Sequence, residues 1–391
     1  MFRFYYIFIA FIISVQTQAG ELSGYLETEV RYFPESPLSV DQYDGFNLSL
    51  SAKPEYHHQW DDGKQTFDFI GFARIDQHDS KRSHFDIREL SWIKAAETWE
   101  LRAGIRKVFW GVTESQHLVD VINQTDLVEH LDGEEKLGQP MINLALIRDW
   151  GTLDFFILPY FRERTFPGSQ GRLLNAGIPI DVDQARYESS AEEYHVDWAI
   201  RFEKTIGNWD IGISHFDGTN RTPRLLMEKG VFIPFYEQIQ QTGLDLQLTQ
   251  DSSLWKLELI SRNESAGSYT AFTGGLEYTF VGIYDSNADL GIITEYLFDD
   301  RQDHAMTPFA NDLMLGMRLA LNDEQSTELL AGTIVDLDNN SSMYLLEASR
   351  RLGDNWKLSL ESYIYSNIDI NDLTYGFRND DFVQFTLAWY F

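Results

Sequence analysis

The chain has 391 residues, no cysteine, and 61 acidic against 31 basic residues, which gives a net charge of −30. The lack of cysteine excludes disulfides and thiolate metal sites, and the acidic excess argues against nucleic-acid binding, which needs a basic surface. The mean hydropathy of −0.31 is that of a water-soluble protein, whereas 14% aromatic residues are more than the core of a soluble fold requires. A transmembrane β-barrel accounts for both values, because its strands alternate lipid-facing apolar residues with lumen-facing polar ones.

Residues 1–19 have the layout of a secretory signal peptide. Arg3 precedes an apolar run over residues 4–15, and the small residues Thr17 and Ala19 mark a cleavage site. The run is shorter than the roughly 20 apolar residues that a membrane-spanning helix needs, which disfavours the alternative of a retained anchor helix. We therefore expect an exported protein whose mature chain, residues 20–391, forms one barrel domain.

From residue 20 onward, apolar segments alternate with connections of two kinds. Short connections that are rich in Gly, Asn, Asp or Ser, such as 60–64, 149–151 and 250–252, alternate with longer or more polar ones. This regularity is typical of antiparallel strands with short turns on one side of a membrane and long loops on the other. We predict an all-β, up-and-down transmembrane barrel of about 18 strands, or about 16 because the periodicity breaks over residues 85–94, as it would at a β-bulge.

The predicted strands carry an apolar stripe on one face and charges on the other. Trp255, Leu257 and Leu259, for example, alternate with Lys256 and Glu258. Charged side chains behind a lipid-facing stripe have to face a wet interior. Mixed signs there favour polar, dipolar solutes over hydrocarbons, and the acid excess favours cations. The lumen-facing charges that we expect to line a pore are Arg102, Arg106, Asp197, Arg201, Asp245, Lys256, Glu258 and Arg318.

One internal segment, residues 101–139, carries a motif. It reads LRAGIRKVFWG over 101–111 and DVINQTDLVEHLDGEEKLGQ over 120–139, so Gly-x-Arg, Trp-Gly and Asp-x-x-Asn-x-x-Asp follow in succession. This succession resembles large porin-like families of proteobacterial outer-membrane barrels and, more distantly, alginate-export-type barrels. The resemblance implies a porin-like barrel without naming a substrate, and Asn123-Gln124 stands where those families have Asn-Pro.

We expect residues 108–139 to fold into the lumen and narrow it, with an ordinary surface loop as the alternative. This is the longest connection in the chain, and its apolar residues need burial. Helix-like spacing predicts short helices over 113–123 and 125–131, the second capped by Thr125. Four acidic side chains of the segment would lie across the lumen from Arg102 and Arg106, namely Glu129, Asp132, Glu134 and Glu135.

The end of the chain alternates in the same way. Phe385, Leu387, Trp389 and Phe391 are apolar, and the residues between them are smaller or more polar. This alternation with a period of two predicts that the four apolar side chains face lipid, although a half-buried edge strand would show the same alternation. The pattern also resembles the terminal assembly signal of bacterial outer-membrane barrels, which ends on Phe with an aromatic residue two positions before it. It implies a Gram-negative outer membrane and recognition by barrel-assembly machinery.

The sequence offers little for catalysis or metal binding. Ser214 and His215 are adjacent, so they point to opposite faces of a strand, and the nine histidines are scattered. The acidic run from Asp336 to Asp338 is explained as a tight turn. We therefore expect no enzyme activity, no cofactor and no metal site.

These observations predict a porin-like, cation-preferring channel for small hydrophilic solutes, narrowed by segment 108–139. One alternative is a structural or recognition barrel without an open pore, whose loops 162–192 and 217–230 would bind a partner. A more remote alternative is an outer-membrane hydrolase. The expected partners are outer-membrane lipid, lipopolysaccharide and the solutes, with no nucleic acid, and the sequence leaves the oligomeric state open.

Overall fold

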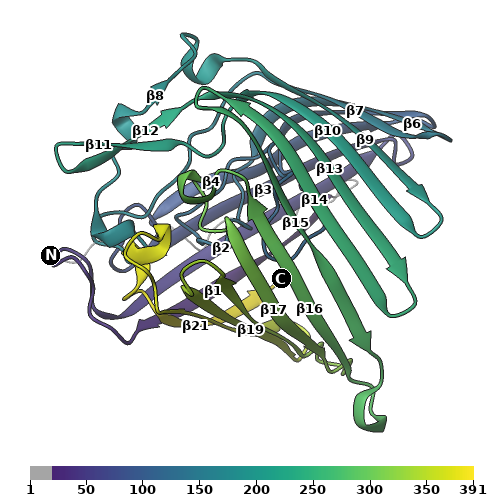
Figure 1. The fold of residues 1–391 in the computed structure, drawn as a ribbon. Helices are drawn as coiled ribbons and strands as arrows, with labels where there is room; N and C mark the ends of the chain where they lie inside the picture. The colour runs from purple at the N-terminus through teal and green to yellow at the C-terminus, as the bar shows by residue number, and fades with distance from the viewer. Residues whose placement is uncertain (1–19) are drawn as a thin grey trace, which may run out of the picture.

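The computed structural model describes residues 20–391, and the expected signal peptide, residues 1–19, lies outside them. The described chain forms an 18-stranded sheet that winds around a central space in chain order (Figure 1). The strands are β1 (Glu21–Phe33), β2 (Gly45–Trp60), β3 (Gln65–Asp76), β4 (His84–Ala95), β5 (Trp99–Arg106), β6 (Gln139–Arg148), β7 (Gly151–Leu158), β9 (Asp197–Ile206), β10 (Trp209–Thr219), β13 (Gln238–Gln250), β14 (Ser253–Glu264), β15 (Gly267–Phe280), β16 (Asp289–Asp299), β17 (Asn311–Ala320), β18 (Glu328–Asp336), β19 (Ser342–Leu352), β20 (Trp356–Ser366) and β21 (Phe382–Tyr390).

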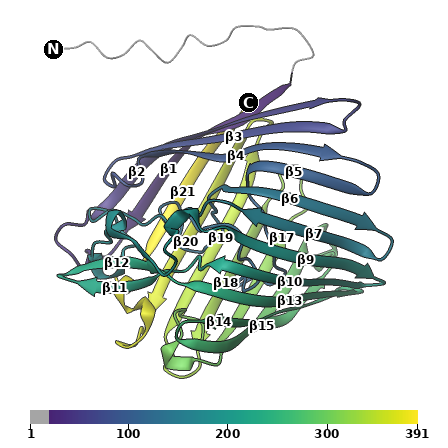
Figure 2. The same cartoon turned by 90° about the horizontal axis from the view of Figure 1, so that it is seen from above.

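Pairing of the first and last strands closes the sheet into a barrel. β1 is hydrogen-bonded to β2 on one side and to β21 on the other, with Val30 opposite Phe385. Both pairings are antiparallel, and the view from above shows β1 and β21 side by side (Figure 2). Closure removes the free edges that an open sheet would expose, so every strand has two neighbours. The prediction of an antiparallel barrel of 18 strands is confirmed, and the alternative of 16 is wrong.

Short turns and long connections alternate along the chain at the predicted places. The turn between β2 and β3 shows why the short ones are tight: Asp61, Asp62 and Gly63 have φ values of 57°, 53° and 80°. Consecutive left-handed residues reverse the chain in a small space, and Asp and Gly tolerate that conformation. The long connections gather at one end of the barrel, together with the small second sheet described next (Figure 1).

A small second sheet stands at the long-connection end. Its strands are β8 (Arg186–Tyr187), β11 (Arg224–Glu228) and β12 (Val231–Tyr236). The expectation that 217–230 is a loop is therefore wrong, because β10 continues to Thr219 and β11 pairs with β12. Among residues 20–391, no helix is long and apolar enough to cross a membrane. The helical turns are η1 (Asn175–Gly177), η2 (Val182–Gln184), η3 (Glu192–Tyr194), η4 (Ile283–Asp285), η5 (Gln302–His304) and η6 (Leu373–Phe377).

The two faces of the sheet differ as the alternation predicted. Leu315 and Phe385 on the outer face are 48% and 53% exposed, whereas Asp245 and Glu258 on the inner face are 5% and 0% exposed. Large apolar side chains left open to the outside of a barrel are what a lipid environment stabilises. Charges enclosed on the inner face need partners, since an unpaired buried charge is costly.

The break in periodicity over residues 85–94 is a β-bulge in β4. Ile70 of β3 lies opposite Glu89, and the next residue, Gly71, lies opposite Ile87, so Arg88 is the extra residue. A bulge re-aims the side chain of the inserted residue. The Arg88 side chain is 2% exposed and takes part in the functional site.

Candidate functional site

Residues 107–138, between β5 and β6, lie inside the barrel and are named the inward segment here. Its apolar side chains Val119 and Ile122 are fully buried against the inner faces of β10 and β13–β15, in a core that includes Phe216 and Ile260. The helices expected over 113–123 and 125–131 do not form, and turns and extended backbone take their place. Two contacts compete with these helices: the N–H of Val119, which a helix would direct to the carbonyl of residue 115, donates to Glu258, and the N–H of Asp126 donates to the carbonyl of Glu135.

Two glutamates of the wall hold the inward segment by its backbone. Glu258 on β14 accepts hydrogen bonds from the N–H groups of Val112 at 2.8 Å, Thr113 at 3.1 Å and Val119 at 3.1 Å. Glu295 on β16 accepts from the N–H groups of residues 114 and 115, both at 2.8 Å. Hydrogen bonds to an ionised group are stronger than neutral ones. These contacts explain how two carboxylates are accommodated inside the barrel.

Gly111 allows the close approach of the segment to Glu258. Its φ is +143°, a conformation that residues with a side chain rarely adopt, and a Cβ there would lie 2.9 Å from the Glu258 carboxylate and from the His117 ring. Glycine has neither penalty. The Trp-Gly pair of the sequence motif is thus a local requirement of the folded segment, with the Trp110 ring buried beside Phe156.

The Asp-x-x-Asn-x-x-Asp motif fastens the inward segment to itself and to its surroundings. Asp120 pairs with Lys136 at 3.1 Å. Asn123 accepts from the N–H of Val108 and donates to the carbonyl groups of residues 106 and 137, each at 2.8 Å, so it ties the two ends of the segment together. Asp126 pairs with the bulged Arg88 at 2.6 Å. Each polar residue of the motif therefore has a structural partner.

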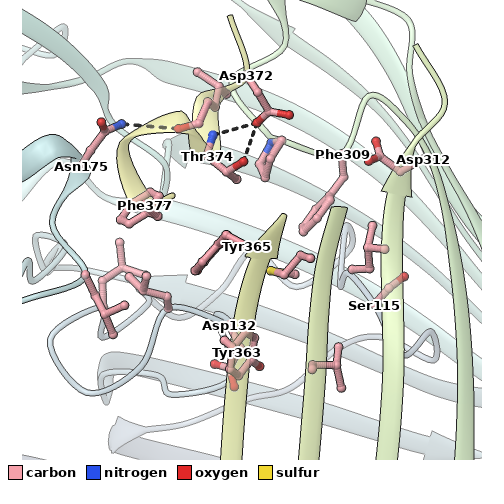
Figure 3. Close-up of a pocket in the computed structure, with 18 of the residues that line it drawn as sticks. Ser115, Asp132, Asn175, Phe309, Asp312, Tyr363, Tyr365, Asp372, Thr374 and Phe377 are labelled. Carbon is pink, nitrogen blue, oxygen red and sulfur yellow. Dashed lines mark hydrogen bonds between the residues drawn. The ribbon is translucent and has the colours of Figure 1, made fainter. Parts of the chain in front are cut away.

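A cavity of about 890 Å³ lies between the inward segment and the long connections. Its lining is largely apolar and aromatic, and Figure 3 shows Phe309, Tyr363, Tyr365 and Phe377 around it. Carboxylates outnumber basic side chains in the lining. The charged lining residues are Glu114, Asp132, Glu134, Asp312, Asp336, Glu347 and Asp372 against His117 and Arg164.

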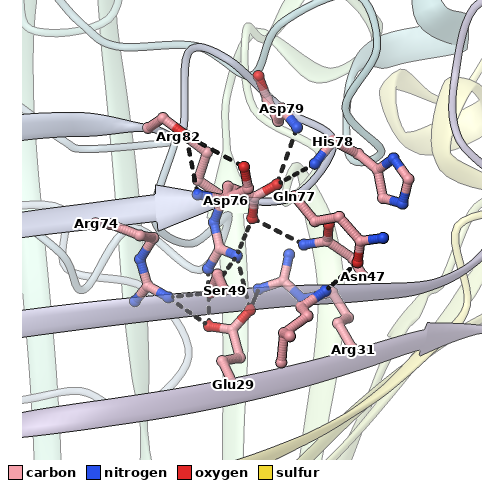
Figure 4. Close-up of polar contacts among 12 residues, drawn as sticks. Glu29, Arg31, Asn47, Ser49, Arg74, Asp76, Gln77, His78, Asp79 and Arg82 are labelled. Atoms are coloured by element: carbon pink, nitrogen blue, oxygen red, sulfur yellow. Dashed lines mark hydrogen bonds and ion pairs between the residues drawn. The ribbon is translucent and has the colours of Figure 1, made fainter. Parts of the chain in front are cut away.

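An ion-pair network around Glu29 of β1 and Arg74 of β3 (Figure 4) also contacts the inward segment through Glu129. Arg82 binds both carboxylate oxygens of Glu29, at 2.7 and 2.8 Å, and also donates to the carbonyl of Val128 at 3.2 Å. Arg74 contacts Glu29 at 3.1 Å and Glu129 at 2.8 Å. The side chains are almost fully buried, so removing one partner would leave a charge without compensation.

Two histidines of the inward segment form hydrogen bonds and ion pairs with acidic side chains. His117 hydrogen-bonds Glu134 at 2.8 Å, and His130 contacts Asp132 at 2.9 Å and Glu361 of β20. Burial alone would lower the pKa of His117, but its hydrogen bond to Glu134 and the Glu258 carboxylate 3.6 Å from its Nδ1 raise it to about 10. Burial likewise opposes protonation of His130, and the charge of Asp132 with the bonds to Asp132 and Glu361 raises its pKa to about 10. Both imidazoles are therefore cations at neutral pH.

The four predicted acids of the segment do not face Arg102 and Arg106. Arg102 pairs with Glu100 on its own strand and lies 3.6 Å from Asp154. Two Arg106 nitrogens are buried and have no hydrogen-bond partner in the described part of the chain, residues 20–391. The acids of the segment pair with other residues instead. Glu129 pairs with Arg74, Asp132 with His130 and Glu134 with His117, while Glu135 is exposed. The segment crosses toward other strands, so the expected pairing is wrong.

The remaining predicted charges all lie on the inner face of the barrel. Their partners are Arg201 with Asp245 at 2.7 Å, Asp197 with Arg221 at 2.7 Å, and Lys256 and Arg318 with Glu114 at 3.7 and 2.7 Å. Of the predicted pore residues, Asp132 and Glu134 line the cavity. Sequence reasoning missed Arg74, Arg88, Glu295, His117 and His130, and the broken phase around Arg88 was the one signal that could have pointed to any of them.

The end of the chain has the expected outward orientation. Phe385, Leu387, Trp389 and Phe391 are 53%, 38%, 37% and 42% exposed on the outer face. Phe391 donates its backbone N–H to the carbonyl of Gly24 at 3.1 Å. The last residue therefore stands at the seam where β1 and β21 meet. Recognition of these residues by assembly machinery stays a prediction.

No protein-family model matches the chain, and the search of curated proteins finds no match. Among solved structures, it is similar to Wzi of Escherichia coli, an outer-membrane protein involved in group 1 capsule assembly and described as a carbohydrate-binding β-barrel, with 10% identity and a TM-score of 0.54 over 94% of this chain and 84% of Wzi. A triple mutant of the porin of Rhodopseudomonas blastica shares 12% identity, with a TM-score of 0.45 over 95% of this chain and all of the porin. The similarity to Wzi agrees with the closed antiparallel β-barrel fold described above.

Proposed function

We propose that the protein is a channel of the Gram-negative outer membrane, with its long connections outside the cell, that admits small hydrophilic solutes past the inward segment. The observation that carries this proposal is the path of that segment. It is bound to Glu258 and Glu295 on one part of the wall and to Arg74 and Arg88 on another, so it spans the lumen. A barrel of this width leaves a water-filled channel unless something fills it.

A preference for cations is part of the proposal. Carboxylates outnumber basic groups around the cavity that a solute would enter from outside, and Asp132 and Glu134 contribute to it from the inward segment. Enclosed walls weaken the screening of these charges by salt, so they raise the local concentration of cations. The inner-face arginines contribute less, because most are paired with acids.

Single-channel recording in planar bilayers tests the proposal. Replacing residues 115–136 with a short Gly-Ser link removes the part of the segment that contacts Glu295, Arg74 and Arg88. We expect conductance to rise severalfold while the barrel stays folded, because the strand pairings do not involve these residues. A matched Gly-Ser replacement of residues 284–286, in the turn before β16, should leave conductance unchanged. Equal conductance in all three proteins would contradict the proposal.

A recognition barrel is the second candidate, supported by the sheet of β8, β11 and β12. That sheet is built from the two long connections predicted to bind a partner, and Arg186 of β8 pairs with Glu228 of β11 at 2.7 Å at the protein surface. It is an ordered platform at the long-connection end. The same recordings separate the candidates, since a barrel that only presents this platform gives no conductance steps with or without residues 115–136.

A further inference from the structure

The cavity has a chemistry that a passage for ions alone does not require. Its walls are mainly apolar, and aromatic rings come from separate parts of the fold: Phe309 before β17, Tyr365 at the end of β20 and Phe377 in η6. The rings of Tyr365 and Phe377 lie 6.2 Å apart with an angle of 25° between their planes. A cavity of this size with aromatic walls and a few polar groups is typical of a site for an organic ligand.

Most carboxylates of the lining already have partners. Glu114 binds Arg318, Asp132 and Glu134 bind the two histidines, and Asp372 caps η6. Asp336 accepts hydrogen bonds from the N–H groups of residues 338 and 339 within its turn. These acids are therefore structural.

Asp312 and Glu347 lie on the wall strands β17 and β19. Asp312 is 2% exposed and accepts a hydrogen bond from the N–H of Asn311 at 3.1 Å, and over residues 20–391 no basic nitrogen lies within 4.0 Å of either carboxylate. Each also stands opposite a like charge on the neighbouring strand, Asp312 opposite Asp336 and Glu347 opposite Glu361. Like charges directly across a strand pair are destabilising. The cavity thus holds two carboxyl groups that no basic side chain of residues 20–391 contacts, and Asp312 and Phe309 both line it (Figure 3).

We propose that this cavity binds an amphipathic organic cation, an aromatic or alkyl ammonium compound. Its apolar body lies against the aromatic wall, and its ammonium group lies near Asp312, where aromatic faces and a carboxylate attract it together. Arg164, a basic residue of the lining, donates to Gln124 and Thr222, and within residues 20–391 no carboxylate lies within 4.0 Å of it, so an anion of similar shape is the comparison that the test needs. The bound cation would be a solute of the proposed channel. Binding itself does not depend on the channel function, and only the transport of the cation rests on it.

Calorimetric titration of the full mature protein in a non-ionic detergent tests the site. The probe is benzyltrimethylammonium, and phenylacetate is the anionic comparison. We expect saturable binding of the cation and at least about tenfold weaker binding of the anion. Asp312→Asn and Tyr365→Leu should each weaken cation binding by about tenfold, whereas the control Asp285→Asn, in the turn η4 at the other end of the barrel, should change it less than about twofold.

Each outcome decides the proposal. Equal binding of the two probes, unchanged affinity in Asp312→Asn, or no saturable binding by protein with normal heat-modifiable mobility would overturn it. Bilayer recordings test the channel function independently of the binding site. Cation binding without conductance steps would overturn the channel alone, and conductance steps without binding would overturn the site alone.

Discussion

Removal of the Glu258 carboxylate should release the inward segment from the wall. In Glu258→Ala, the N–H groups of Val112, Thr113 and Val119 lose their acceptor, and so does the Thr113 hydroxyl at 2.7 Å. A buried donor left without a partner costs about 1 to 3 kcal/mol. Three such donors would cost roughly 3 to 9 kcal/mol, and we take the lower end because water that enters the lumen replaces part of the loss.

A change of about 3 kcal/mol shifts the equilibrium between the bound and released segment by roughly a hundredfold. We expect long-lived high-conductance states in planar bilayers and new protease cleavage within residues 111–119. The barrel itself should remain folded, since its strand pairing does not depend on this carboxylate. Glu328→Ala, which removes an exposed carboxylate from β18, is the matched control. The reasoning is refuted if the variant keeps native conductance and protease resistance.

Other regions of the barrel give further predictions. Leu315→Arg, near the middle of β17 on the outer face, should lower the free energy of unfolding by about 2 to 4 kcal/mol in a reversible folding assay in lipid. Gln247→Arg on the inner face should lower it much less. Equal losses would mean that the inner and outer faces are assigned the wrong way round. Deletion of Phe391 should reduce insertion into the outer membrane without reducing export, and normal heat-modifiable yield would argue against a terminal assembly signal. The pKa of His130 is about 10, above its usual 6.5. The stabilisation from its ion pair with Glu361 is therefore fully present below pH 6.5 and is lost as pH rises through 10. Open-channel probability should therefore increase over that interval in the native protein and should be high and less pH-dependent in His130→Gln.

The sequence by itself determined the barrel strands and their two faces, and it limited their number to about 18 or 16. Alternation with a period of two is local, since neighbouring side chains of a strand point to opposite sides. Leu315 could therefore be assigned to lipid and Glu258 to the lumen without knowledge of any partner. The turn residues are local in the same sense, because Asp and Gly tolerate left-handed backbone wherever the chain must reverse.

The conformation of the inward segment is determined by the tertiary structure. Its spacing of apolar residues suggested helices, but the segment is bound by Glu258 and Glu295, more than 100 residues away in the chain, and Glu258 takes the N–H of Val119 that a helix would have used internally. Local periodicity carries no information about such acceptors. Helix propensity is weak enough to be overridden by charged hydrogen-bond partners inside a closed wall.

The ion pairs of the site were likewise beyond local reasoning. Glu129 could be placed in the lumen from sequence, but its partner Arg74 is 55 residues away, and His130 meets Glu361 across 231 residues. Closing β1 onto β21 curves the wall and brings distant strands around the same segment. Which charges meet depends on that curvature and on the bulge that turns Arg88 inward, so the pattern of charges follows from the sequence, while their pairing follows from the closed barrel.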